Sequence, residues 1–166
     1  MKRFKMFGSP ILDRRAAVAA GLIASAGYVV AMEADLALVG HNTDDLLFLG
    51  RPLVGHHHHW AKPAGFVMHM ANGAVLALAY AKFAHDRFSG PHWWRGALFA
   101  NLENCALYPL TAFDTYHPAR RDGQLDRYWH PTAFLQSIPR HIVYGALLGT
   151  LYARWRDPAP AGSDDD

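Results

Sequence analysis

Cysteine and charge are both scarce in this chain. The 166 residues include one cysteine, Cys105, which excludes an intrachain disulfide and any metal motif built from several thiols. Charged residues make up only 18% of the sequence, and the formal net charge is +2. Because this charge is small and the basic residues are scattered, we expect no nucleic-acid partner.

Familiar catalytic motifs are also absent from the sequence. It contains no GxSxG, P-loop or HExxH pattern. Membrane desaturases and hydroxylases carry several separated histidine boxes on the cytoplasmic side, whereas this chain has one run of four, His56 to His59. We therefore predict no catalytic residues and favour a protein that is not an enzyme.

What the sequence does contain is four long apolar stretches, at about residues 16–39, 63–83, 93–113 and 131–152. A membrane-spanning helix needs about 20 mostly apolar residues, and each stretch meets or approaches that length. A soluble four-helix bundle would need a polar stripe along each helix, which AAVAAGLIASAGYVVAM lacks. The pattern predicts an all-α polytopic membrane protein, with one four-transmembrane-helix bundle over residues 1–156 and a disordered acidic tail over 157–166.

The first stretch has a second interpretation, as a signal peptide cleaved after Ala24-Ser25-Ala26. The apolar run continues to Met32, and three more stretches follow, so an uncleaved membrane helix is the simpler hypothesis. In the third stretch, Pro109 is expected to kink or loosen the last turns. Residues 40–62, which include the histidine run, are expected to form a loop.

Basic residues favour an orientation with both termini in the cytoplasm of a bacterial cell, as a multi-pass protein of the inner membrane. Tryptophans at both expected interfaces agree with this orientation. The inner side would hold Lys2, Arg3, Lys5, Arg14, Arg15, Lys82, Arg87, Arg95, Arg154 and Arg156, and the outer side Arg51, Lys62, Arg120, Arg121 and Arg127.

Small residues at helical spacing are suited to close packing between membrane helices. Gly145 and Gly149 form a GxxxG pair, and Gly73 is followed four residues later by Ala77. These patterns support a compact bundle.

Three segments carry a resemblance to a known group. Their matching residues are His69, Gly73 and Tyr80 in GFVMHMANGAVLALAYA, Arg95, Gly96 and Phe99 in WWRGALFANLENCALYPLTAF, and His141, Tyr144, Gly145 and Gly149 in RHIVYGALLGTLYARW. Over about residues 65–155 the chain resembles the YagU-like small bacterial four-helix inner-membrane proteins of unknown function. Ala100 stands where the pattern has Gly, and His56 to His59 lie outside it. The resemblance implies a fold and a membrane, and no particular chemistry.

Polar side chains inside the apolar stretches are the candidate site, because a charge in hydrocarbon costs on the order of 3 kcal/mol or more. They are Glu33, His69, Glu103, Arg140 and His141. At 1.5 Å of rise per residue, Glu33 and His69 lie roughly 10 Å below the outer surface, and the other three near mid-membrane. We predict two tiers, with Glu103 and Arg140 as mutual partners.

Three alternatives to such internal pairing remain open. Carboxylates and imidazoles on facing helices can bind Zn, Cu or Fe, although the Glu-x-x-His motif of di-iron bundles is missing. Haem between His69 and His141 would have to bridge the two tiers. A chain of Glu and His side chains through the interior could also form a proton or solute pathway.

The run His56, His57, His58 and His59 has two interpretations. Neutral imidazoles suit Zn, Cu or Ni, and His41, Asp44 and Asp45 could add ligands from the same loop. Neighbouring residues in an extended chain point in alternate directions, however, so at most two would share an ion. A solvated polar loop is the simpler hypothesis.

The sequence therefore favours a non-catalytic accessory or stress-related membrane subunit without a cofactor. It would act through lipid-buried helix contacts, as a homo-oligomer or within a larger membrane complex. The alternative is a membrane protein that handles a metal, a proton or a solute through its buried Glu and His. On either hypothesis we expect a ligand site, if one exists, near Glu33 and His69 beneath the histidine run.

Overall fold

The described part of the chain, residues 12–55 and 57–156 of a computed structural model, is helical and contains no strand. Its elements are α1 (Arg14–Val39), α2 (Asp45–Val54), the 3₁₀ segment η1 (His58–Trp60), α3 (Ala61–Phe83), α4 (His92–Leu107), the 3₁₀ segment η2 (Tyr108–Tyr116), α5 (Pro118–Arg121) and α6 (Pro131–Arg156). The all-α prediction is confirmed. The predicted acidic tail lies outside the described residues, as do Lys2, Arg3, Lys5 and His56.

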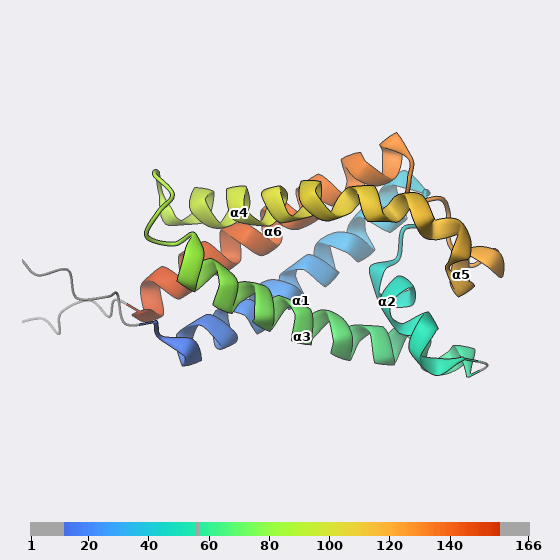
Figure 1. Cartoon of the computed structure of the whole chain (residues 1–166), viewed down its shortest axis with the longest axis horizontal. Helices are drawn as coiled ribbons and strands as arrows, with labels where there is room; N and C mark the ends of the chain where they lie inside the picture. Colours follow the sequence, from blue (N-terminus) through green and yellow to red (C-terminus); the bar gives the residue numbers. More distant parts are fainter. Residues whose placement is uncertain (1–11, 56, 157–166) are drawn as a thin grey trace, which may run out of the picture.

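Four long helices, α1, α3, α4 and α6, form the body of the molecule (Figure 1). The extensive packing is between α1 and α3, α1 and α6, and α4 and α6, while α2 packs on α3. Helices α3 and α4 meet near their connecting turn, where the rings of Tyr80 and Phe99 lie 5.6 Å apart. Away from that turn the two helices diverge (Figure 1). The bundle is therefore least closed between α3 and α4.

Alanine and glycine let the helices approach closely. A Cβ atom on Gly145 would lie 2.3 Å from the carbonyl oxygen of Gly96, and one on Gly149 would lie 2.1 Å from that of His92. The glycine pair of α6 is thus used against α4 within the same chain. Gly73 of α3 faces Ser25 of α1 in the same manner, because its Cβ would fall 1.7 Å from Ser25 Oγ.

Two helices, α1 and the segment His58–Phe83, are long and apolar enough to cross a membrane. Only 22% and 28% of their apolar windows are buried inside the protein. The core helix of a soluble protein would bury most of such a window. Their outward surface carries side chains such as Val30, Val67 and Val75, each more than 60% exposed.

The connection between the first two long helices differs from the predicted loop. Asp44 caps the N-terminus of α2, with its carboxylate accepting a hydrogen bond of 3.0 Å from the amide of Leu47. An N-cap Asp before the apolar run Leu46–Leu49 is a helix-start signal that the sequence analysis did not use. At the end of α4 the α-helix gives way to the tighter 3₁₀ segment η2 at Tyr108, one residue before Pro109, where a kink or a loosening was predicted.

Candidate functional site

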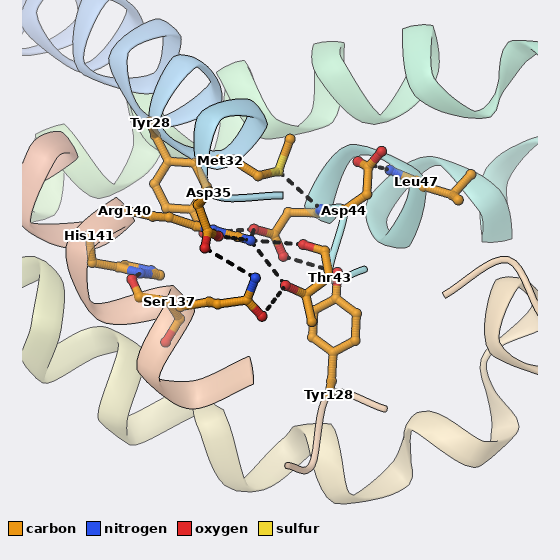
Figure 2. A network of polar contacts seen from close by, with 12 residues as sticks. Tyr28, Met32, Asp35, Thr43, Asp44, Leu47, Tyr128, Ser137, Arg140 and His141 are labelled. Carbon is orange, nitrogen blue, oxygen red and sulfur yellow. Dashed lines mark hydrogen bonds and ion pairs between the residues drawn. The ribbon is translucent and has the colours of Figure 1, made fainter. Parts of the chain in front are cut away.

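Arg140 is the centre of the polar interior. Its side chain is only 2% exposed and reaches from α6 toward Asp35 of α1 and Thr43 of the connection to α2 (Figure 2). Nε and Nη2 donate to Asp35 Oδ2, and Nη1 donates to Asp45 Oδ2 at 3.0 Å. The carbonyl oxygen and the hydroxyl of Thr43 accept the remaining two hydrogen bonds, at 2.8 and 3.0 Å. All five N–H groups of the guanidinium are therefore used.

The two carboxylates around Arg140, those of Asp35 and Asp45, also accept hydrogen bonds from other side chains. The hydroxyl of Tyr28 donates to Asp45 at 2.7 Å, and that of Tyr128 donates to the same carboxylate at 3.2 Å. The Gln136 amide donates to Asp35 at 3.1 Å. This network joins α1, α2, α6 and the segment before α6 at one point, which explains how a buried guanidinium is tolerated.

The predicted pairing of Glu103 with Arg140 is wrong. Arg140 pairs with Asp35 and Asp45, and Glu103 lies instead beside His141, with 3.7 Å between Oε2 and Nε2. The depths estimated from helical rise assumed that residues 40–62 form an external loop. Because α2 folds in against α3, it brings Asp45 to the level of Arg140 and supplies a nearer anion.

The predicted upper tier of Glu33 with His69 does not form either. Glu33 is exposed on the outside of α1, whereas His69 is buried, at 9% exposure. The position of each residue around the helix axis explains the difference. Tyr28, Met32 and Asp35 lie on the inner face of α1, and Glu33 lies outside that face. His69 belongs with the lower group: the Tyr28 ring lies 4.8 Å from the His69 ring and 5.1 Å from the His141 ring.

These groups line one internal cavity of about 240 Å³. Its polar wall includes Asp45, His69, Glu103, Arg140 and His141. Its aromatic wall is made by Tyr28, Phe48, Tyr108, Tyr128 and Tyr144. For comparison, an engineered apolar cavity of about 150 Å³ binds benzene. The cavity is therefore large enough for a small organic molecule.

The cavity reaches the protein surface between α3 and α4. Asn72 of α3 and Leu107 of α4 both line it, and both are exposed, Leu107 at 50%. These are the two helices that diverge from their connecting turn (Figure 1). A ligand would enter through this side of the bundle.

One nitrogen in the cavity wall has no partner. His69 Nε2 is buried and makes no hydrogen bond with any described residue. A buried polar atom without a hydrogen-bond partner costs about 1–3 kcal/mol of stability, and a bound ligand could supply that partner. It is the clearest sign that the cavity is built to hold a polar group.

The end of the bundle that carries α2 and α5 is closed by the segment between α4 and α6 (Figure 1). Asp114 accepts a 2.6 Å hydrogen bond from the amide of Tyr128, and His117 Nε2 donates to the carbonyl oxygen of Phe48 at 2.8 Å. The His117 ring stacks on Phe48, with the ring centres 4.2 Å apart. Burial lowers the pKa of His117 and raises the pKa of Tyr128 well above its usual value.

The histidine run does not converge on one point. His57 and His59 are exposed, and their rings lie edge to face 6.3 Å apart. His58 contacts Arg51 at 3.3 Å and Gln124 at 3.4 Å through its two ring nitrogens. Within residues 12–55 and 57–156, no three His, Cys, Asp or Glu side chains are grouped to hold one metal ion.

Several residues of the site escaped the sequence analysis. Asp35 was not among the candidate residues, and Asp45 was considered only as an extra metal ligand beside the histidine run. No sequence pattern indicated a role for Tyr28, Gln136 or Tyr128, because their contacts depend on which helix faces them. The NTDD motif before an apolar run was the one usable clue, since it marks a helix start.

Comparisons with known proteins give no relative for this chain. No protein-family model, no curated protein and no solved structure matches it. The resemblance to the YagU-like group stays a prediction.

Proposed function

We propose that this protein is a four-span integral protein of the bacterial inner membrane that binds a small organic molecule in its internal cavity. It would act as a solute-handling protein and not as a catalyst. The observation that carries the binding proposal is the cavity itself, with the unpartnered Nε2 of His69 in its wall. Concave, largely apolar sites with a few convergent polar groups are the usual form of small-molecule sites.

The four-span arrangement is supported by length and by the distribution of charge. Helix α6 has 26 residues, and α4 continues through η2 for a combined length of about 40 Å, which exceeds a hydrocarbon core of about 30 Å. The start of α1, the end of α6 and the turn between α3 and α4 lie at one end of the bundle, and α2 and α5 lie at the other (Figure 1). Arg156 bonds to Asp86 at the first end, where the basic residues are more numerous.

The binding proposal is tested by identifying what the protein retains. The full chain is purified in detergent, and small molecules released by denaturation are identified by mass spectrometry. Leu107→Trp places a bulky ring at the mouth of the cavity and should reduce the retained ligand by about tenfold, the equivalent of about 1.4 kcal/mol. The matched control is Leu110→Trp, on an exposed residue that does not line the cavity. Retention by both variants at the wild-type level would contradict the proposal.

The accessory-subunit role is a second candidate, and it rests on a different surface. Among the long helices α4 packs extensively only on α6, and α4 with η2 leaves Leu102, Leu110 and Phe113 exposed at 52–66%. A second copy or a partner helix would cover this surface as well as lipid does. Cross-linking from Leu110→Cys, followed by mass analysis of the product, distinguishes a protein neighbour from lipid.

A further inference from the structure

We infer that the cavity is selective for an organic cation, specifically a small primary ammonium compound with an apolar body. This inference rests on the proposed binding function and specifies its ligand class. It is carried by three observations: the saturation of Arg140, the facing acceptors of Glu103 and His141, and the aromatic wall.

Among the described residues, Arg140 is the only Lys or Arg in the cavity wall, and it cannot recruit an anion. Its five N–H groups are all directed to Asp35, Asp45 and Thr43. The two carboxylates more than neutralise its charge. With Glu103 in the wall, the cavity wall and the network around Arg140 together carry three acidic side chains against one basic one, so their field favours a positive ligand.

Glu103 and His141 present two acceptors to each other. His141 Nδ1 lies 2.7 Å from the carbonyl oxygen of Ser137, and because a carbonyl only accepts, Nδ1 must carry the hydrogen. In the neutral ring, Nε2 is then an acceptor that faces Glu103 Oε2 at 3.7 Å. Among the described residues none donates a hydrogen bond to Glu103. A donor placed between these atoms would satisfy both.

An ammonium group fits this position by its chemistry. It supplies three N–H donors and no acceptor, so it can bind Glu103 Oε2 and His141 Nε2, which face each other, and His69 Nε2 is a further unpartnered acceptor in the same cavity wall. Hydrogen bonds between an ammonium and a carboxylate are charge-assisted and stronger than neutral ones. The protein thus offers acceptors from three of its four long helices if His69 carries its hydrogen on Nδ1.

The aromatic wall favours an organic over an inorganic cation. The hydroxyls of Tyr28 and Tyr128 donate to Asp45, that of Tyr144 donates to the carbonyl oxygen of Gly73, and that of Tyr108 donates to backbone carbonyls before α6. The hydroxyls are therefore used elsewhere, and the rings form an apolar lining. Such a lining accommodates a hydrocarbon body and attracts a cation to ring faces, but does not replace the water shell of a metal ion.

The experiment compares three probes of one shape and different charge. Benzylammonium, benzyl alcohol and benzoate are titrated into the purified full chain in one detergent, and binding is followed by calorimetry, with potassium chloride as the inorganic control. We expect benzylammonium to bind at least about tenfold more tightly than benzyl alcohol, and benzoate and potassium not to compete. Glu103→Gln should remove this preference. Glu33→Gln, which removes the same charge from the exposed face of α1, should keep it.

The outcomes separate the two proposals. Equal binding of benzylammonium and benzyl alcohol, both blocked by Leu107→Trp, would overturn the cation inference and leave the binding function standing. A preference that survives Glu103→Gln would also overturn it. If none of the probes binds and the purified protein retains no small molecule, both proposals fail.

Discussion

Several buried contacts of the protein interior depend on one side chain, the guanidinium of Arg140. Two carboxylates from different helices depend on it for charge compensation, and the Thr43 backbone is held by it as well. Replacing a whole buried ion group by apolar residues is often neutral, whereas removing one partner leaves an uncompensated charge. The effect of substitution should therefore be asymmetric.

We predict that Arg140→Gln destabilises the protein by about 3–5 kcal/mol, because Asp35 and Asp45 lose their counter-charge. The double variant Arg140→Gln with Asp35→Asn should be milder than the sum of the two single variants. Unfolding in denaturant, followed by circular dichroism, measures both effects. Arg154→Gln, an exposed position near the end of α6, serves as the control. Additive single and double effects would show that the pair does not interact.

His117 should make the end of the bundle that carries α2 and α5 less stable in acid. Its pKa is lowered in the folded state, mainly by burial, while the unfolded chain has a pKa of about 6.5. The unfolded state therefore binds more protons as the pH falls, and stability decreases below about pH 6.5. Protonation would also place an N–H on Nδ1, which is buried without a partner.

The measurement for His117 is the melting temperature between pH 7.5 and 5. His117→Gln keeps a donor for the carbonyl oxygen of Phe48 and cannot be protonated, so the loss of stability across this range should be smaller than in the wild type. His59→Gln, at an exposed position, should leave the pH dependence unchanged. An identical pH profile for the wild type and His117→Gln would show that another group is responsible.

At the scale of elements, the close crossing of α4 and α6 depends on glycine. The carbonyl oxygen of Gly96 lies where a Cβ of residue 145 would be, so any side chain there must push the helices apart. Overpacking of this kind costs about 1–3 kcal/mol or more. The same separation would widen the cavity, because Glu103 and His141 lie on these two helices.

We predict that Gly145→Val lowers stability by about 3 kcal/mol and weakens retention of the cavity ligand. Ala106→Val introduces the same side chain at an exposed position of α4 and is the matched control. Denaturant unfolding and ligand mass spectrometry of the two variants give the comparison. A Gly145→Val protein as stable as the control would mean that the helices do not cross at Gly96.

The helices were predictable from sequence to a greater extent than the site. Each of the four apolar stretches overlaps one long helix, because about 20 mostly apolar residues with few breakers leave few alternatives. The partners of Arg140 were not predictable, because they depend on the position of α2, a ten-residue helix between two long ones. Glu33 and Asp35 are two residues apart and face opposite ways, a distinction that hydropathy alone does not make.

For the molecule as a whole, the outward surface is mostly apolar between its ends, with Glu33 as an exposed charge on α1, and most charged residues lie at the ends. Exposed side chains such as Val30 and Val75 lie on the two helices that bury the least of their apolar windows. Arg121 lies at the end that carries α5, and Ser89 lies in the turn at the opposite end. If the bundle spans the membrane with both termini inside, these two positions face opposite compartments.

We predict that single cysteines at these positions react from opposite sides of the membrane. In a Cys105→Ser background, Arg121→Cys should be labelled by an impermeant maleimide applied from the periplasm, because it follows the third span. Ser89→Cys should be labelled only after the inner membrane is opened. Both positions are exposed, so folding should not limit the reaction. Labelling of both cysteines from the periplasm would rule out four spans, and labelling of Ser89→Cys alone would reverse the orientation.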